Sequence, residues 1–202
     1  MTGLARRYIA IEGIEGAGKS TVAKAIADHL KTVGHPAIFV REPGGTDVGE
    51  RIREILLGNG DPPSPRAEAV LFAASRAQLV ETVIKPALMD RSWVVSDRSA
   101  YSSLAYQAIG RGLDLTAIRN LNDIAIDGLW PGRVVLLRLS AEAGLERQAV
   151  DDRIGSEAIT FHHRVADGFD ALAAAEPDRF IVVDAEPPVT EVIGSVIDGL
   201  GL

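Results

Sequence analysis

The residues from Gly13 to Ser20 have the types and the spacing that bind phosphate. They match the pattern G-x-x-x-x-G-K-[ST] at every fixed position, and Thr21 follows directly. Glycines let backbone N–H groups close around phosphate oxygens, where a side chain would block the approach. Lys19 supplies a mobile cation for the outer phosphates, and the Ser20 hydroxyl can ligate Mg²⁺. We therefore expect a nucleoside triphosphate to bind here.

The segments on either side of this stretch have the pattern that a phosphate loop requires. Residues 8–11 are apolar and indicate a short buried strand that enters the loop. Apolar side chains recur at helical spacing in residues 21–33, so we expect a helix to leave it. A glycine-rich turn without a ligand is the alternative, and the order of strand, loop and helix favours the phosphate site. Because Lys19 lies in a polar loop, we expect it to face solvent when no nucleotide is bound.

The rest of the chain alternates strands and helices. Apolar runs predict four further strands, at 37–40, 92–96, 134–139 and 180–183. Helical spacing predicts helices at 48–57, 66–88, 100–109, 115–126 and 189–200. In the first of these, Val48, Ile52, Ile55 and Leu56 are expected to share one face. Five strands that alternate with helices give an α/β fold, a parallel sheet covered on both faces. We expect residues 1–202 to form a single domain, because no linker or repeat interrupts the pattern.

The composition excludes several classes of protein. Of the 202 residues, 47% are hydrophobic and 24% are charged, which is ordinary for a globular domain. There is no cysteine, so disulfides and thiolate metal sites are excluded. The net charge of −7 argues against broad nucleic-acid binding. No apolar run approaches the length of a membrane span, and residues 1–7 lack the apolar core of a signal peptide. We therefore expect a cytoplasmic protein that binds neither nucleic acid nor membrane.

A second set of charged residues stands at the end of the third predicted strand. GTPases, ATPases and small-molecule kinases share the phosphate loop, but this chain lacks the Asn-Lys-x-Asp motif and the Asp-x-x-Gly loop of GTPases. It has Asp97 and Arg98 after that strand instead. An aspartate there can hold the metal's hydration shell, and an arginine can bind a second phosphate bidentately. A surface ion pair that caps a helix is the alternative.

The helix after Asp97 carries polar side chains on one face. Arg98, Ser102 and Tyr106 are spaced i, i+4 and i+8, with Ser103 adjacent. Such a face could line a polar small-molecule pocket, and a solvated face is the alternative.

The long helix at 66–88 carries an i, i+4 pair, Phe72 and Arg76. The ring could stack on a base, and the guanidinium could donate to the carbonyl edge of that base. A packed phenylalanine beside a surface arginine is the alternative.

Together these motifs resemble those of bacterial thymidylate kinases. The shared stretches run in family order from about Tyr8 to about Leu172, and Arg-Glu-Pro-Gly-Gly-Thr is particularly specific. They are 13–21, 41–46, 71–78, 97–98, 105–107, 110–114 and 152–154. The resemblance implies a P-loop NTPase fold of the nucleoside monophosphate kinase type, with a short lid at about 146–157. It also implies transfer of the γ-phosphoryl group of ATP to dTMP, which gives dTDP and ADP for dTTP biosynthesis, and a homodimer.

On the ATP side, the resemblance assigns the phosphate loop and one residue near the lid. These are Gly13, Glu15, Gly16, Ala17, Gly18, Lys19, Ser20, Thr21 and Arg147. The cofactor is Mg²⁺, which we expect Ser20 and Asp97 to hold through water. Glu15 matches a carboxylate near the acceptor sugar and the metal. It joins Lys19, Arg98 and Arg153 in the expected catalytic set.

On the dTMP side, the resemblance assigns phosphate, base and sugar contacts. Arg53 and Arg98 match the arginines that hold the acceptor phosphate. Phe72 matches a ring stacked on thymine, and Arg76 matches a guanidinium that reaches a thymine carbonyl. Tyr106 matches a ring under the deoxyribose that leaves no room for a 2′-hydroxyl. The other expected residues of this site are Glu15, Pro43, Ser102, Ser103 and Gln107.

The expected lid departs from the family pattern. The lid is shorter and poorer in arginine than in many bacterial members. A separate departure follows Asp97 and Arg98, where this chain has Ser99 and the family usually has Tyr or His. The phosphate loop contains no arginine, so another cation must meet the charge that develops on the transferred group. We expect Arg153 to supply it. An exposed ion pair of Arg153 with Asp151, Asp152 or Glu157 is the alternative.

The helices at 48–57 and 66–88 carry more apolar positions than one face against the sheet requires. Leu71, Leu79 and Val83 are among them. A two-fold dimer would cover this surplus.

Two further readings of the chain remain open. Another small-molecule kinase of the same architecture is one, and a non-catalytic nucleotide-binding module is the other. His162 and His163 have no assigned role, because adjacent helical residues diverge too far to form a metal pair, and we expect both to be structural or to face solvent.

Overall fold

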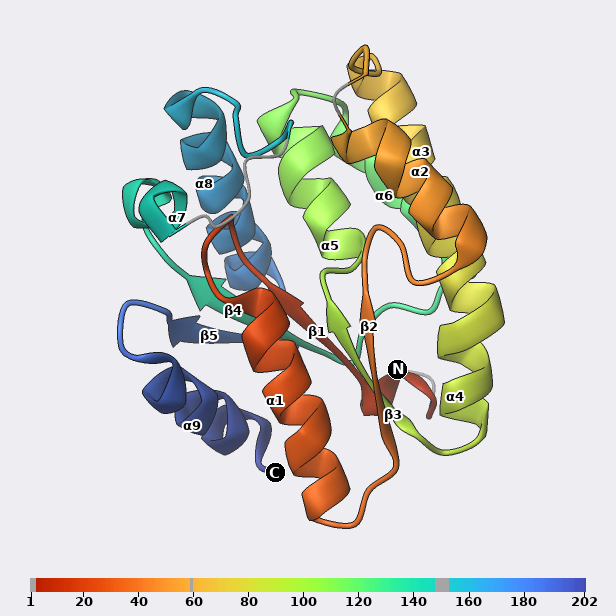
Figure 1. Cartoon of the computed structure of the whole chain (residues 1–202), viewed down its shortest axis with the longest axis vertical. Helices are drawn as coiled ribbons and strands as arrows, with labels where there is room; N and C mark the ends of the chain where they lie inside the picture. The colour runs from red at the N-terminus through yellow and green to blue at the C-terminus, as the bar shows by residue number, and fades with distance from the viewer. Residues whose placement is uncertain (1–2, 59, 148–152) are drawn as a thin grey trace.

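The computed structural model describes residues 3–58, 60–147 and 153–202, and its centre is a five-stranded parallel sheet (Figure 1). The strands run in the order β2-β3-β1-β4-β5, and every neighbouring pair is parallel. Their bounds are β1 Tyr8–Glu12, β2 Ala37–Arg41, β3 Trp93–Asp97, β4 Arg133–Arg138 and β5 Phe180–Asp184. All five residues of β1 are buried, which is why it appears in the sequence as an unbroken apolar run before Glu12. The predicted fold class is confirmed.

Helices cover both faces of the sheet. One face is covered by α1 (Lys19–Thr32) and α9 (Val189–Leu200), which contact each other (Figure 1). Elements on the other side include α8 (Ile159–Ala175), α5 (Ala100–Ser103) and its π-helical continuation η3 (Leu104–Gly110). The remaining helical elements are η1 Ala5–Arg7, α2 Asp47–Leu57, α3 Pro65–Leu79, η2 Val80–Ile84, α4 Lys85–Met89, α6 Leu115–Ala125 and α7 Ala141–Arg147.

Local signals in the sequence explain where several helices begin. The side chain of Thr46 accepts a hydrogen bond from the Gly49 N–H at the start of α2. Ser64 caps α3 in the same way, and a proline fills the first position of that helix. The predicted helix at 66–88 is a continuous helical path that passes from α3 through the π-helical η2 into α4.

The apolar face predicted for α2 is only partly correct. Leu56 is buried, whereas Val48 and Ile55 are exposed at 49% and 56%. The reason is that α2 packs chiefly against α3 at the rim of the fold and does not lie across the sheet. Leu79, which was expected to belong to a surface surplus, is fully buried in a cluster with Ile84 and Leu88.

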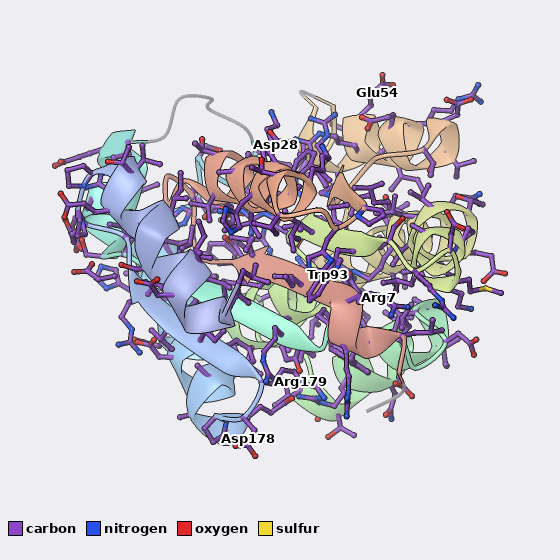
Figure 2. The ribbon with its side chains drawn as sticks, turned by 90° about the horizontal axis from the view of Figure 1, so that it is seen from below. Arg7, Asp28, Glu54, Trp93, Asp178 and Arg179 are labelled. Atoms are coloured by element: carbon purple, nitrogen blue, oxygen red, sulfur yellow. The ribbon has the colours of Figure 1, made fainter. Side chains whose placement is uncertain are left out.

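All five strands point the same way, so the loops that leave their carboxyl ends meet at one edge. Figure 2 views the molecule from below, and its labels Arg7, Trp93 and Arg179 mark where β1, β3 and β5 begin. Most of the predicted site residues lie at the opposite edge, where the strands end. Among the residues that the structure describes, no helix has the length and apolarity required to cross a membrane.

Candidate active site

A cavity of about 460 Å³ lies at the carboxyl edge of the sheet, and its lining brings together segments that are far apart in the chain. Most of the predicted site residues line it: Glu15, Gly16, Gly18, Lys19, Ser20, Thr21, Pro43, Arg53, Phe72, Arg76, Asp97, Arg98, Ser102, Ser103, Tyr106, Gln107 and Arg147. Gly13, Ala17 and Arg153 were also predicted, but the lining does not include them. Gly13 packs against β4, because a Cβ there would lie 2.6 Å from the carbonyl oxygen of Leu137.

Lys19 is buried in the phosphate loop, with 8% of its surface exposed. Its Nζ donates a hydrogen bond of 2.5 Å to the Ile14 carbonyl. Burial, followed by the nearby charge of Arg98, lowers the pKa of Lys19 to about 8. The expectation that Lys19 faces solvent is therefore wrong. The loop folds its lysine inward, where it borders the cavity.

The phosphate loop also contacts the helix that follows β4. Gly16 has a φ of +71°, and a Cβ on it would lie 2.0 Å from the carbonyl oxygen of Gly144 in α7. This close approach of two backbones requires glycine. At the end of α7, the Arg147 guanidinium donates to the carbonyls of Ala185 and Glu186 at 2.7 and 3.0 Å. Arg147 is thereby held between the loop after β5 and the cavity.

Asp97 and Arg98 end β3 beside the phosphate loop. The Ser20 hydroxyl donates a hydrogen bond to the Asp97 carboxylate. Arg98 has a φ of +74°, a strained backbone conformation for a residue with a side chain. Its guanidinium lies 2.9 Å from a Glu15 oxygen and 3.3 Å from the Ser102 hydroxyl. A surface ion pair does not describe this contact, because both side chains are largely buried.

Glu15 is the acidic centre of the cavity. The Tyr106 hydroxyl lies 2.8 and 2.9 Å from its two oxygens, and the Arg98 guanidinium stacks on the Tyr106 ring at 4.9 Å. Although burial alone raises the pKa of a carboxyl, the contacts with His162 and Arg98 hold the pKa of Glu15 well below its ordinary value. Glu15 is therefore ionised throughout the neutral range.

Glu12, at the end of β1, binds the first residues of the helix after β3. It is fully buried and accepts hydrogen bonds from the Ser99 and Ser102 hydroxyls at 2.7 and 2.6 Å. Burial raises the pKa of Glu12. These contacts fix the face on which Ser102 and Tyr106 reach the cavity.

Phe72 and a buried arginine network form another part of the cavity wall. Arg76 is 2% exposed, so it is not the surface residue of the alternative interpretation. It donates to Glu42 at 2.5 Å and to the Ser103 hydroxyl and the Ser99 carbonyl at 3.0 Å each. A fourth hydrogen bond goes to the side-chain oxygen of Asn122. These four bonds fix the plane of the guanidinium.

Two further predicted residues have defined partners beside this network. Arg53 donates a hydrogen bond of 2.9 Å to the Pro43 carbonyl, so α2 and the loop after β2 are joined at the cavity wall. Gln107 donates one of 3.0 Å to Glu68, a buried carboxylate of α3.

Arg153 lies outside the cavity lining. Its guanidinium donates to the Leu56 carbonyl at 2.8 Å and to Glu68 at 2.7 Å. Glu68 also accepts a bond of 3.1 Å from Arg111, which in turn pairs with Glu157. The predicted lid at 146–157 lies partly outside the described residues, as do Asp151 and Asp152.

The two adjacent histidines occupy different environments. His163 is exposed and lies 3.0 Å from Glu142. His162 is 1% exposed, and its Nδ1 lies 3.3 Å from Oε2 of Glu15. No sequence pattern indicated this contact, because it joins α8 to the loop after β1.

Other lining residues were missed as well. Arg41 and Glu42 precede Pro43 at the end of β2, a position that could have indicated them, whereas Leu57 and Ile154 carried no such signal.

The oxygen donors around Ser20 suit a hard cation such as Mg²⁺. Ser20 and Asp97 are in direct contact, so a cation between them would have a hydroxyl and a carboxylate oxygen within reach. No group of three or more His, Asp or Glu side chains among the described residues could hold a metal by itself. This fits an ion that shares its coordination with phosphates and water.

Known proteins are similar to this chain over nearly its whole length. The family model described as "Thymidylate kinase" matches residues 11–196. A thymidylate kinase of Synechococcus sp. (strain JA-3-3Ab) is 46% identical over 94% of this chain and 92% of its own. A thymidylate kinase of Deinococcus radiodurans is 46% identical over 92% of this chain and 91% of its own. The crystal structure of thymidylate kinase from Ehrlichia chaffeensis is similar with a TM-score of 0.79 and a sequence identity of 31%. The match covers 96% of this chain and 97% of that one. The chain belongs to the thymidylate kinase family, and its activity is phosphoryl transfer from ATP to dTMP.

Proposed function

We propose that the cavity holds both substrates at once, ATP with Mg²⁺ against the phosphate loop and dTMP against Phe72. The observation that carries this proposal is that a single cavity is lined both by Lys19 of the phosphate loop and by Phe72 and Arg76 of α3. Arg98 also lines this cavity and contacts both Glu15 of the phosphate loop and Ser102 of the helix after β3. We infer that the two nucleotides meet with their phosphates beside Arg98.

The chemistry requires alignment and charge compensation more than covalent participation by the protein. The acceptor is an anionic phosphate that needs no strong general base, and its approach to the γ-phosphate is opposed by repulsion. We assign Lys19 to the ATP phosphates and Arg53 and Arg98 to the dTMP phosphate. Because these guanidinium and ammonium groups already line the cavity, they need little reorganisation when charge develops.

We assign Mg²⁺ to the contact between Ser20 and Asp97. When bound, the ion would neutralise charge on the phosphates. The residues themselves are held for this task, because the Ser20 hydroxyl already points at the Asp97 carboxylate.

The dTMP end selects for base and sugar by shape and by a limited set of donors. Of the five N–H groups of Arg76, four are used within the protein, which leaves one for a thymine carbonyl. The buried Tyr106 ring is fixed by its hydroxyl on Glu15, and we assign it to the floor under the deoxyribose. A 2′-hydroxyl would then meet a ring that cannot move aside.

Arg153 remains our candidate for the charge that the phosphate loop does not provide. It is bound to Glu68 and Leu56 in this structure, so the proposal requires these bonds to exchange for bonds to phosphate. Arg147, which does line the cavity, is assigned to the adenine end.

Assembly and location complete the proposal. Exposed apolar side chains on neighbouring helices, Val48, Ile55 and Val70, support a homodimer through α2 and α3. We place the enzyme in the cytoplasm, because its two charged substrates do not cross membranes unaided.

A panel of acceptors tests the proposed function. Purified protein is incubated with ATP, Mg²⁺ and each of dTMP, dUMP, dCMP, dAMP, dGMP and thymidine, and diphosphate or monophosphate products are separated. We expect dTDP as the dominant product. Preferential phosphorylation of thymidine, or of another monophosphate, would overturn the assignment of the cavity, and binding of ATP without any transfer would indicate a non-catalytic module.

A further inference from the structure

The contact between His162 and Glu15 joins two parts of the chain that no predicted role connects. His162 lies in the first turn of α8, directly after the segment 153–158, and is 1% exposed. Its Nδ1 lies 3.3 Å from Oε2 of Glu15, in the phosphate loop. A histidine buried at this distance from an ionised carboxylate is held by an electrostatic contact and not by apolar packing alone.

Glu15 has partners on every side, and His162 is the one that comes from the C-terminal part of the chain. Oε1 accepts from Arg98 at 2.9 Å and from Tyr106 at 2.8 Å. Oε2 accepts from Tyr106 at 2.9 Å and faces His162. Each carboxylate oxygen thus has two partners: Arg98 contacts only Oε1, His162 contacts only Oε2, and Tyr106 contacts both.

The charge on His162 matters because of what surrounds Glu15. Two cations that the proposed reaction uses, Lys19 and Arg98, both interact with Glu15. An ionised Glu15 paired with Arg98 alone would cancel the charge that Arg98 offers to a phosphate. A further cation on Oε2, the oxygen that Arg98 does not contact, shares that negative charge and leaves more of the Arg98 charge available.

The environment favours the protonated imidazole. The contact with Glu15 raises the pKa of His162 despite its burial, and backbone groups of Gly155 and Glu157 act in the same direction. His162 contacts Glu15 from the phosphate loop and Phe161 on α8 itself, and Tyr106 from η3 contacts both of these residues. Nε2 of His162 is buried without a hydrogen-bond partner among the described residues.

We propose that His162 is a positioning residue, which holds the Glu15 carboxylate and shares its negative charge, so that Arg98 keeps positive charge available for the acceptor phosphate although it is paired with Glu15. This inference rests on the proposed function, because it takes Arg98 as the dTMP-phosphate ligand. If His162 has this role, kcat/KM for dTMP depends on His162, although His162 is not expected to contact either substrate. The effect is expected in the KM for dTMP and in kcat, and not in the KM for ATP.

The test compares His162→Asn with the matched control His163→Asn. Asparagine can still donate to Glu15 but cannot carry the charge, and the control removes the adjacent exposed imidazole. At pH 6.5 we expect His162→Asn to lower kcat/KM for dTMP about five- to tenfold, the size of one lost charge-assisted contact. The control should stay within twofold of wild type. Thermal unfolding of both variants establishes that they are folded.

The pH profile separates positioning from a structural role. The protonated form of His162 is the useful one, so its contribution is present below its raised folded pKa and is lost as pH rises through it. The ratio of kcat/KM between wild type and His162→Asn should therefore fall toward one as pH rises. Titration of Lys19 and of the dTMP phosphate affects both proteins and cancels in the ratio. A pH-independent ratio, or a dTMP KM within twofold of wild type, would overturn the proposal.

The two levels of the proposal fail in different ways. If wild type and His163→Asn both phosphorylate dTMP while His162→Asn matches them, the inference about His162 is wrong and the proposed function stands. If wild type itself does not phosphorylate dTMP, the proposed function is wrong and the premise of the inference falls with it.

Discussion

The buried network around Arg76 gives the sharpest prediction about stability. Arg76→Ala removes four hydrogen bonds and leaves Glu42, which is 4% exposed, without its cation. Removing one partner of a buried ion pair costs about 3–5 kcal/mol, because the remaining charge has lost its compensation. The variant should therefore lose about 3–5 kcal/mol of unfolding free energy. The sequence analysis assigned Arg76 only to a thymine carbonyl and predicted none of these bonds within the protein.

Urea unfolding at several pH values measures this loss and its cause. Burial raises the pKa of Glu42, and Arg76 opposes that rise. A carboxyl whose folded pKa lies above its unfolded value keeps its proton longer in the folded state, so its contribution to stability falls as pH rises. Without Arg76 the folded-state pKa of Glu42 rises further, so the loss of stability with rising pH becomes larger. The deficit of Arg76→Ala should then be largest near neutral pH and should shrink as pH falls toward the raised pKa of Glu42.

Two controls isolate the network. Adding Glu42→Gln to Arg76→Ala removes the stranded charge and should restore part of the lost stability. Arg138→Ala breaks an exposed pair with Asp170 and should cost less than about 1 kcal/mol. If Arg76→Ala costs no more than Arg138→Ala, or if its deficit is the same at all pH values, the reasoning from buried charge is refuted.

Three further predictions concern the sugar pocket, the lid and the assembly. Tyr106→Phe should keep the preference for dTMP over ribothymidine monophosphate, whereas Tyr106→Ala should narrow it; equal preference in both variants would remove the ring from the sugar pocket. Arg153→Ala should lower kcat far more than it raises either KM, and a loss of less than about threefold would exclude a transition-state contact. Light scattering at micromolar concentration should find a dimer that Ile55→Glu weakens, and a monomeric wild type would contradict the proposed interface.

Local patterns in the sequence were sufficient to predict the fold. The five strands are short apolar runs bounded by polar or turn residues, and burial on both faces of a parallel sheet produces such runs. The phosphate-loop stretch predicted its own position between β1 and α1, because its glycines and its lysine have few other uses together. The rule that parallel strands present their loops at one edge then indicated the loops that carry Pro43, Asp97 and Arg98. Arg53 and Gln107, which line the cavity from helices, were assigned only by the family resemblance.

What the sequence did not predict depends on contacts between distant residues. The Asn122 side chain accepts from Arg76, 46 residues away, and no spacing rule connects a position in α6 with one in α3. His162 meets Glu15 only because α8 packs beside η3 at the end of β1. Lys19 was expected to face solvent because loops usually do, but here the loop encloses its own lysine. In each case tertiary packing determined the environment.

The central claim is that one cavity holds the two substrates with their phosphates meeting beside Arg98. A molecule in which adenosine and thymidine are joined through a chain of five phosphates tests it directly, because such a ligand must occupy both ends together. Steady-state inhibition should be competitive with respect to ATP and also with respect to dTMP, and Arg98→Leu should weaken the inhibition. Inhibition that is competitive with only one of the two substrates would contradict a shared cavity.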